Sequence, residues 1–351
     1  MRRSAAALAV AMLGAAAPVA LGAGEGPRTV EIAAVGDVMP GAYDYGLPSD
    51  GGRGTFAGIG RSLEAQLTLG NLEGALTMRS SSKCGGGAGA CYVFRMPPAY
   101  APMLRLAGFD VMNLANNHAL DAGYGGVRDT VRGLRRVGIR PTGVAGTVTR
   151  LRAGDLTVGV VGFGTNDGGN RLTDVATARA LVRRADRRAD VVIVTFHGGA
   201  EGAGAQRVPP SSESFLGANR GNLRNFAHAV VDEGADLVVG HGPHVLRGME
   251  VRRGRLIAYS LGNFVGYRAF NLRGPNGVSV VLRARLGANG CLRSARAVPA
   301  RLAGFGRPEL GGPAIQALRR LSQLDFGPRA PWIARDGRIA ARKACPCRQK
   351  A

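Results

Sequence analysis

The alternation of short apolar runs with amphipathic stretches is the feature that most constrains the fold of this chain. Between residues 28 and 305, apolar runs of strand length recur at 30–35, 67–70, 109–114, 156–163, 190–196, 236–239, 255–260 and 278–286. Segments with helical periodicity lie between several of them, at 124–137, 174–188 and 220–233. Strands that alternate with helices are typical of α/β domains, so we expect an α/β fold.

Each predicted helix has one apolar face and a recognisable end. In 174–188, an apolar residue recurs every three or four positions, and Asp174 can cap the N-terminus. The arginine-rich remainder of this helix is most simply a solvated surface. Gly138 is a natural stop for the helix 124–137.

The N-terminus has the pattern of an export signal. Arg2 and Arg3 precede an apolar run over residues 5–17, and small residues follow it. We expect cleavage after residues 1–23 and a periplasmic or extracellular mature protein. The alternative is a membrane anchor, but the run falls short of the ~20 strongly apolar residues that a spanning helix needs. A single body over 28–305 would follow, then a C-terminal extension, 306–351, with one short helix near 313–324.

The chain is strongly basic, with a formal charge of +22, and only three of its 46 basic residues are lysines. Export argues against nucleic acid as a partner, whereas an anionic polymer outside the cytoplasm remains open.

The five cysteines are consistent with an oxidising compartment. Cys84 and Cys91 flank a glycine-rich run and could close a small disulfide loop. Cys345 and Cys347 lie in the basic tail, where an accessory disulfide or an ordinary tail is favoured over a metal site. Cys291 is left either unpaired or as a partner for the tail.

Polar residues follow six of the apolar runs. The runs lead into Asp37, into Asn71 and Glu73, into Asn117 and His118, into His197, into His241 and His244, and into Asn263. Because ligand sites in open α/β sheets form beyond the carboxyl ends of the strands, these side chains are candidates for one shared site.

Four of the five histidines lie at these strand ends; His228 falls inside the predicted helix 220–233 and is interpreted as structural. Imidazole, carboxylate and amide ligands without thiolate suit divalent cations, but they do not separate Mn, Fe, Zn and Mg. A pair of such ions supports hydrolytic chemistry. Ser260 lacks a nucleophile elbow, and neither a P-loop nor a dinucleotide fingerprint is present.

Six segments taken in order resemble the CapA family, which is named for poly-γ-glutamate capsule synthesis and is similar to calcineurin-like metallophosphoesterases. The most specific are Asn116-Asn117-His118 with Asp121, and Ser260-Leu261-Gly262-Asn263-Phe264. The others are the segments 36–41, 71–73, 197–201 and 234–245, so that the resemblance covers about 30–285.

The resemblance implies a metallophosphatase-like layered sandwich of two β-sheets flanked by helices, with two divalent metal ions at one edge. It implies metal ligation by Asp37, Glu73, Asn117, His197, His241 and His244. It makes His118 a general acid supported by Asp121, and makes Asn71, Glu201 and Asn263 supporting or substrate contacts.

The sequence departs from the metallophosphoesterase pattern in three places. Met39 stands where the opening Asp-x-His motif has its histidine, Asn-Leu-Glu replaces Gly-Asp, and two residues separate His241 from His244. Which histidine would serve which ion is therefore open.

Two functions remain as hypotheses. The first is a metal-dependent hydrolase or transferase that acts on a phosphoester, or on an amide or ester of an anionic polymer. The second is a non-catalytic subunit that handles or exports the polymer alongside membrane proteins of capsule synthesis.

Overall fold

The computed structural model describes residues 28–84 and 91–341. The predicted signal segment 1–23, and Cys345 and Cys347, lie outside the described residues.

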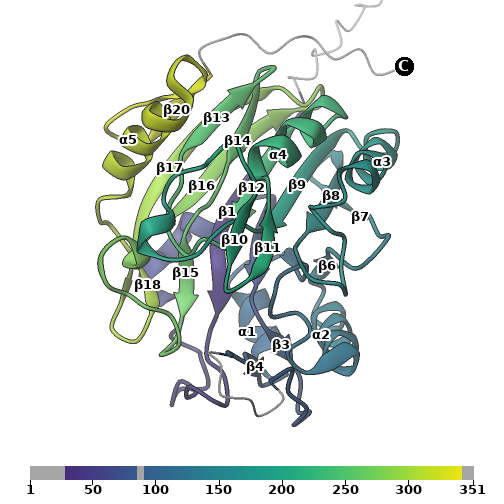
Figure 1. Ribbon diagram of the computed structural model, residues 1–351, viewed down its shortest axis with the longest axis vertical. Coiled ribbons are helices and arrows are strands. Elements are labelled where there is room, and N and C mark those ends of the chain that lie inside the picture. The colour runs from purple at the N-terminus through teal and green to yellow at the C-terminus, as the bar shows by residue number, and fades with distance from the viewer. Residues whose placement is uncertain (1–27, 85–90, 342–351) are drawn as a thin grey trace, which may run out of the picture.

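Two β-sheets form the centre of the molecule (Figure 1). The larger has the order β19-β20-β17-β16-β1-β2-β5-β6, with β15 beside β1 and β18 beside β17. Its strands are β1 Thr29–Met39, β2 Leu67–Leu72, β5 Val111–Asn113, β6 Arg140–Thr142, β15 Asn263–Gly266, β16 Val278–Gly287, β17 Leu292–Ala303, β18 Arg307–Leu310, β19 Trp332–Ile333 and β20 Arg338–Ala340.

The smaller sheet has the order β13-β14-β12-β9-β8-β7. Its strands are β7 Thr149–Ala153, β8 Leu156–Phe163, β9 Val191–His197, β12 Leu237–His241, β13 Met249–Arg252 and β14 Arg255–Ala258. Two further pairs, β3 Ala75–Leu76 with β4 Arg95–Met96 and β10 Glu213–Phe215 with β11 Ala218–Gly221, lie outside these sheets.

The alternation of side chains along each strand explains why the sheets stack. In β1, Val30 and Ile32 pack in the same apolar cluster as Val191 and Ile193 of β9, between the two sheets. The intervening Ala33 and its equivalents face the other way, toward the helices. Both faces of each central strand are therefore buried.

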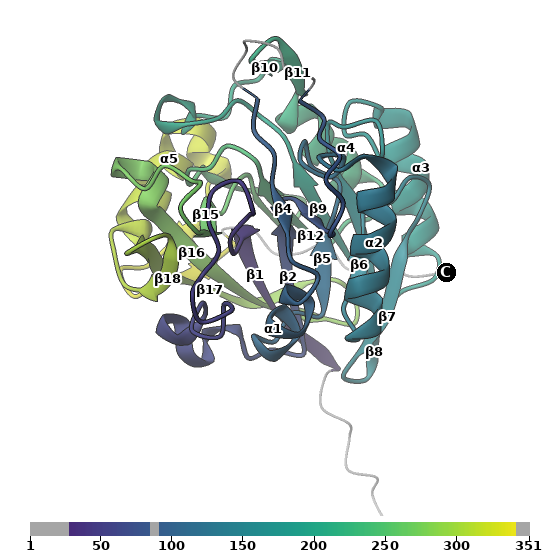
Figure 2. The ribbon, with the colours of Figure 1, turned by 90° about the horizontal axis from the view of Figure 1, so that it is seen from below.

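Helices cover the two outer faces. The helices are α1 Tyr100–Leu106, α2 Gly123–Arg136, α3 Val175–Asp186, α4 Leu223–Asp232 and α5 Ala314–Phe326, with short 3-10 turns at Ala57–Leu63, Ala203–Ala205, Gly274–Gly277 and Gly327–Arg329. Leu104 of α1 and Leu134 of α2 pack on the larger sheet, and Val182 of α3 and Val230 of α4 pack on the smaller one (Figure 2). The predicted layered sandwich, with two sheets flanked by helices, is confirmed.

The three internal helices agree with the periodicity to within a few residues. As predicted, the Asp174 carboxylate caps α3 by accepting a hydrogen bond from the Thr177 N–H. Gly138 follows α2 with a φ of 83°, the left-handed conformation expected of a glycine stop.

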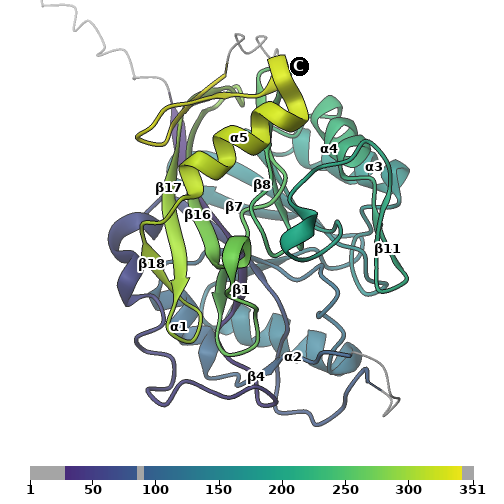
Figure 3. The same cartoon turned by 60° about the vertical axis from the view of Figure 1, so that its left-hand side comes forward.

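The segment after residue 287 contains more regular structure than its sequence indicates. β17 pairs with β16 along nearly its whole length, and β20 adds to β17 through Ala295 and Ile339. β17 was not predicted because its apolar positions are mostly alanines between arginines, with Pro299 in the middle. Figure 3 shows α5 lying along β16 and β17 at this side of the molecule.

Cys84 and Cys91 are joined by a disulfide, with their Cα atoms 5.9 Å apart. Within residues 28–84 and 91–341, no helix has both the length and the apolar character needed to cross a bilayer.

Close backbone contact at Gly36 fixes the end of β1, and this yields a stability prediction. A Cβ at Gly36 would collide with the carbonyl oxygen of Gly262, which accepts a hydrogen bond from the Asp37 N–H. Gly36→Ala should therefore destabilise the fold by about 1–3 kcal/mol. Gly133→Ala is the matched control, because Gly133 lies within α2 with open space around it.

Denaturant unfolding followed by circular dichroism measures both variants. The control should gain about 0.5–1 kcal/mol from the better helix propensity of alanine. A Gly36→Ala protein as stable as wild type would contradict the close contact.

Candidate active site

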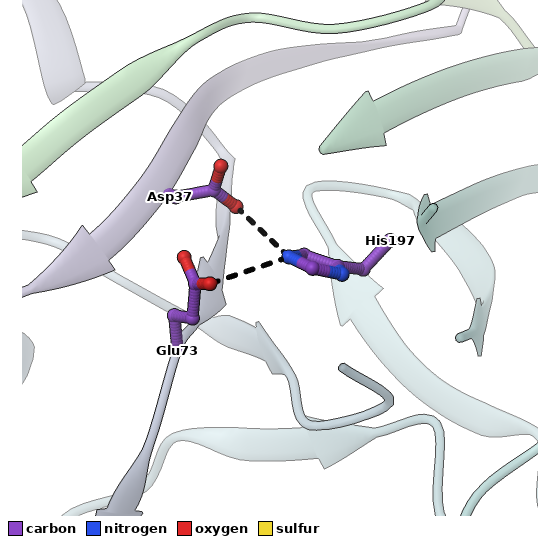
Figure 4. A group of neighbouring side chains, drawn as sticks. All are labelled: Asp37, Glu73 and His197. Carbon is purple, nitrogen blue, oxygen red and sulfur yellow. Dashed lines mark ion pairs between the residues drawn. The ribbon is translucent and has the colours of Figure 1, made fainter. Parts of the chain in front are cut away.

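The ends of four strands bring acidic and imidazole side chains together. Asp37 lies near the end of β1, Glu73 directly follows β2, and His197 and His241 are the last residues of β9 and β12. β1 and β2 are parallel neighbours in one sheet, as are β9 and β12 in the other, so their carboxyl ends meet at one edge. Figure 4 shows Asp37, Glu73 and His197 pointing toward one another.

Glu73 lies at the centre of the cluster and is fully buried. Its Oε1 atom is 3.5 Å from His197 Nε2, 3.4 Å from His244 Nε2 and 3.8 Å from His118 Nε2. These separations exceed the usual 2.7–3.2 Å of a hydrogen bond. Among the described residues, neither Glu73 oxygen has a hydrogen-bond partner.

Asp37 makes the second set of close approaches. Its Oδ1 atom is 3.9 Å from His197 Nε2 and 4.0 Å from His241 Nδ1, and its Oδ2 atom is 3.4 Å from His244 Nδ1. The structure thus brings five of the six predicted metal ligands into one cluster.

Burial and mutual charge determine the protonation of the cluster. Burial, together with the neighbouring Glu73 carboxylate, raises the pKa of Asp37 to about 8. Burial acts to raise the pKa of Glu73 as well, but the imidazoles around Glu73 lower it overall. Burial lowers the pKa of His197 to about 4 and that of His241 to about 3. Burial also opposes the charge on His244, yet Glu73 and Asp37 raise its pKa to about 9.

The donor set fits a divalent cation. Two ligand atoms that each lie 2.0–2.2 Å from one ion are separated by roughly 3.4 Å in tetrahedral geometry, close to the spacings around Glu73. Both ring nitrogens of His197 and the Nδ1 atom of His241 are buried without hydrogen-bond partners in the described part of the chain. Buried polar atoms are normally paired, so His197 Nε2 and His241 Nδ1, which are unpaired and face carboxylates, have the pattern expected of ligand positions.

Three hydrogen bonds orient the ligands. Asn71 Nδ2 donates to Asp37 Oδ1 at 2.9 Å. Thr195 Oγ1 lies 2.9 Å from His241 Nε2, which leaves the Nδ1 atom of that ring toward Asp37. His244 Nδ1 lies 2.7 Å from Asn263 Oδ1. Asn71 and Asn263 are fully buried and lie against Asp37 and His244, and their predicted roles as supporting or substrate contacts both stay predictions.

His118 and Asp121 form a dyad beside Glu73. His118 Nδ1 lies 2.7 Å from Asp121 Oδ2, which leaves Nε2 toward the cluster. Lys83 Nζ is 2.6 Å from Asp121 Oδ1, and the Phe94 N–H donates to Asp121 Oδ2 at 2.5 Å. The Phe94 ring also stacks on His118, with their centroids 4.0 Å apart.

Asn117 is less clearly placed than the other predicted ligands. Its backbone oxygen accepts a hydrogen bond from Lys83 Nζ, and its buried Oδ1 atom has no hydrogen-bond partner within the described ranges. No described contact joins its side chain to Asp37 or Glu73. Asn117 therefore stays a predicted ligand.

Glu201 and His244 form the solvent-accessible side of the site. Their side chains are 15% and 14% exposed, whereas Asp37, Glu73 and His197 are fully buried. Glu201 Oε2 lies 3.7 Å from His244 Nε2, and its Oε1 atom lies 2.8 Å from the buried Arg220 guanidinium.

His244 lies in the cluster, whereas His228 lies outside it. His244 adopts a φ of 58°, which is uncommon for any residue except glycine. His228, interpreted as structural, lies outside the cluster and pairs with Glu250 at 2.9 Å.

Sequence analysis did not identify Lys83, Phe94, Thr195 or Arg220. Thr195 and Phe94 lie within or beside apolar runs, and Arg220 is one arginine among many. Lys83 carried a usable signal, since it is the only lysine between residues 4 and 342.

Comparison with known proteins places residues 31–268 within the family described as bacterial capsule synthesis protein PGA_cap. The chain is 30% identical to the PGA biosynthesis protein CapA of Bacillus subtilis over 46% of its own length and 44% of that protein. It is 31% identical to the capsule biosynthesis protein CapA of Bacillus anthracis over 45% of its own length and 40% of that protein. The match thus spans less than half of each of these curated relatives.

Among solved structures, similarity is lower. A hypothetical protein from Thermus thermophilus matches with a TM-score of 0.46 and 17% identity, covering 77% of this chain and 98% of that one. The NAD nucleotidase of Haemophilus influenzae matches with a TM-score of 0.43 and 13% identity, covering 84% of this chain and 56% of that one. Likeness at this level carries no inference about activity.

The family match covers most of the two-sheet body and both halves of the cluster, from Asp37 to His244. The chain belongs to the bacterial capsule synthesis protein family PGA_cap.

Proposed function

We propose that this chain is an exported, metal-dependent hydrolase or transferase of capsule or poly-γ-glutamate synthesis. Its substrate would be a phosphoester, or an amide or ester of the anionic polymer. The observation that carries this proposal is Glu73, a buried carboxylate with no hydrogen-bond partner among the described residues. Three imidazoles surround it, and one of them, His118, belongs to a dyad with Asp121.

The buried side chains divide into holding and proton-transfer roles. Asp37, Glu73, His197, His241 and His244 would hold divalent cations. Bound cations would supply an activated water near neutral pH and neutralise charge that develops on substrate oxygens. A ring already committed to a cation cannot also release a proton freely, so this role falls to another histidine.

His118 is placed for proton transfer. Its Nδ1 is paired with Asp121, so the dyad keeps one proton on that nitrogen and presents Nε2 for exchange with the substrate. When the ring carries a second proton on Nε2, that nitrogen would donate it to the leaving oxygen or nitrogen as the bond to it breaks, which leaves the neutral imidazole with its proton on Nδ1. The stacked Phe94 ring fixes the plane of the imidazole and shields one of its faces from water.

Separate measurements of metal content and turnover test this division. His118→Ala should retain wild-type metal while turnover of a generic phosphodiester falls by ~10²–10⁴-fold, the usual contribution of a general acid. His197→Ala should lose metal and turnover together. Metal per chain is measured by inductively coupled plasma mass spectrometry on the samples used for kinetics.

His228→Ala is the matched control, a histidine outside the cluster, and should change neither quantity. Loss of metal from His118→Ala would identify His118 as a ligand. Wild-type protein that holds metal but hydrolyses neither phosphodiesters nor poly-γ-glutamate would favour the non-catalytic polymer-handling function.

The disulfide joins the two segments that contact the dyad, and this yields a further prediction. Lys83 directly precedes Cys84, and Phe94 follows Cys91 by three residues, so both contacts to Asp121 flank the cross-link. Lys83→Met should lower turnover by roughly 10- to 100-fold through misplacement of the acid, with metal content unchanged.

Cys84→Ser/Cys91→Ser should lower turnover in the same direction, and mild reduction of wild type should reproduce that loss. Adding reductant to the double-serine variant controls for effects elsewhere in the chain and should change nothing more. Full turnover in both variants would show that the dyad needs neither Lys83 nor the cross-link.

A further inference from the structure

An arginine-lined groove lies along α2, away from the buried ligand cluster. It has a volume of about 900 Å³ and is bounded by α2 on one side and by β6 and β7 on the other. Figure 2 shows α2 running alongside these two strands. Six arginines contribute to its walls: Arg128, Arg132, Arg135, Arg136, Arg140 and Arg150.

The walls and the floor differ in chemistry. All six arginines are exposed, whereas Val127, Val131, Val144 and Val148 are partly buried and Pro141 is buried. The groove therefore presents cationic rims above an apolar floor. Every residue that lines it is Arg, Val, Thr or Pro.

Within the described chain the cationic rims have no ion-pair partners, although Arg132 contributes to the lowered pKa of Asp129. No carboxylate of residues 28–84 and 91–341 forms an ion pair with any of the six arginines. Asp129, the only acidic residue of α2, instead accepts from Arg79 Nε and Thr77 Oγ1.

Helix stability does not account for this arrangement. Arg128, Arg132 and Arg136 recur every four residues, and like charges at that spacing destabilise a helix. The helix dipole favours Arg135 and Arg136 in the last turn, but it gives no reason for Arg128, Arg132, Arg140 and Arg150. The six arginines come from α2, β6 and β7, and all of them line the same groove.

The position of α2 links the groove to the dyad. α2 begins at Gly123, two residues after Asp121, and at 1.5 Å per residue Arg128 lies about 7.5 Å along the helix axis from Gly123. The arginines then continue for about 12 Å more, to Arg136. Val144 follows β6 at the sheet edge that carries the ligand cluster, whereas Arg140 begins β6 at the opposite edge.

We propose that this groove binds an extended polycarboxylate chain whose backbone contains methylene groups. The carboxylates would pair with the arginine rims, and the methylenes would lie on the valine floor. The absence of Trp, Tyr and Phe from the lining disfavours single-stranded nucleic acid, which binds by stacking its bases, and a membrane surface, where aromatic side chains anchor. The idea that the groove guides the polymer toward the dyad rests on the proposed function. Binding of the polymer in the groove, however, does not require turnover.

Binding of fluorescently labelled poly-γ-glutamate to the mature chain, measured by anisotropy, tests the groove. Arg132→Glu/Arg136→Glu should weaken binding about tenfold or more. The matched control is Arg187→Glu/Arg188→Glu, which makes the same charge change on exposed arginines beyond α3 and should weaken binding less than about twofold. Arg132→Gln/Arg136→Gln replaces the reversal if circular dichroism shows that the reversal does not fold.

Equal weakening in groove and control variants would overturn the proposal in favour of diffuse attraction by net charge. Tighter binding of wild type to phosphatidylglycerol vesicles or to an oligonucleotide than to the polymer would overturn the choice of ligand. Turnover of a small phosphodiester should be unchanged in the groove variant. A wild-type protein that binds polymer through the groove but lacks turnover would refute only the proposed function.

Discussion

Two carboxylates buried side by side are the constraint on which the site depends. Asp37 and Glu73 are both fully buried, and the Glu73 carboxylate disfavours ionisation of Asp37. Such a pair is costly unless positive charge lies close to it. The carboxyl ends of β9 and β12 place the His197 and His241 imidazoles against the carboxylates, and the positive charge comes from His244, whose pKa the two carboxylates raise to about 9. A divalent cation between them would stabilise both carboxylates in the ionised form.

A network of asparagines connects this centre to the scaffold. Asn113 and Asn116 both donate to the Asn71 side chain, which in turn donates to Asp37. Asn116 also accepts from the His118 N–H, so the turn that carries the dyad is fixed by the same network as the carboxylate. Amides suit this role because one side chain both donates and accepts, and they add no charge to a buried site.

Much of the fold and most of the clustered side chains could be predicted because both depend on strand periodicity. An apolar run followed by a polar residue locates a strand end, and Asp37, Glu73, His197 and His241 all fit that rule. Lys83 and Phe94 do not, because they reach Asp121 from a segment outside the two main sheets, and only tertiary packing brings them there. The roles of Arg220 and the groove arginines could not be predicted for a different reason. The chain contains so many arginines that its sequence does not indicate which of them share a surface. β17 was missed because alanine contributes little apolar signal even when it is buried.

The left-handed backbone of His244 has a consequence for how this protein can change over time. Glycine or asparagine would adopt that conformation at a lower free-energy cost. Histidine at this position therefore lowers the stability of the fold but places an imidazole at the solvent-accessible side of the site. In a lineage that no longer needed the imidazole, substitution here would be rewarded by a more stable fold. A relative with glycine at this position and an otherwise intact core would therefore be a candidate for a chain that has kept the fold but lost the function of this imidazole.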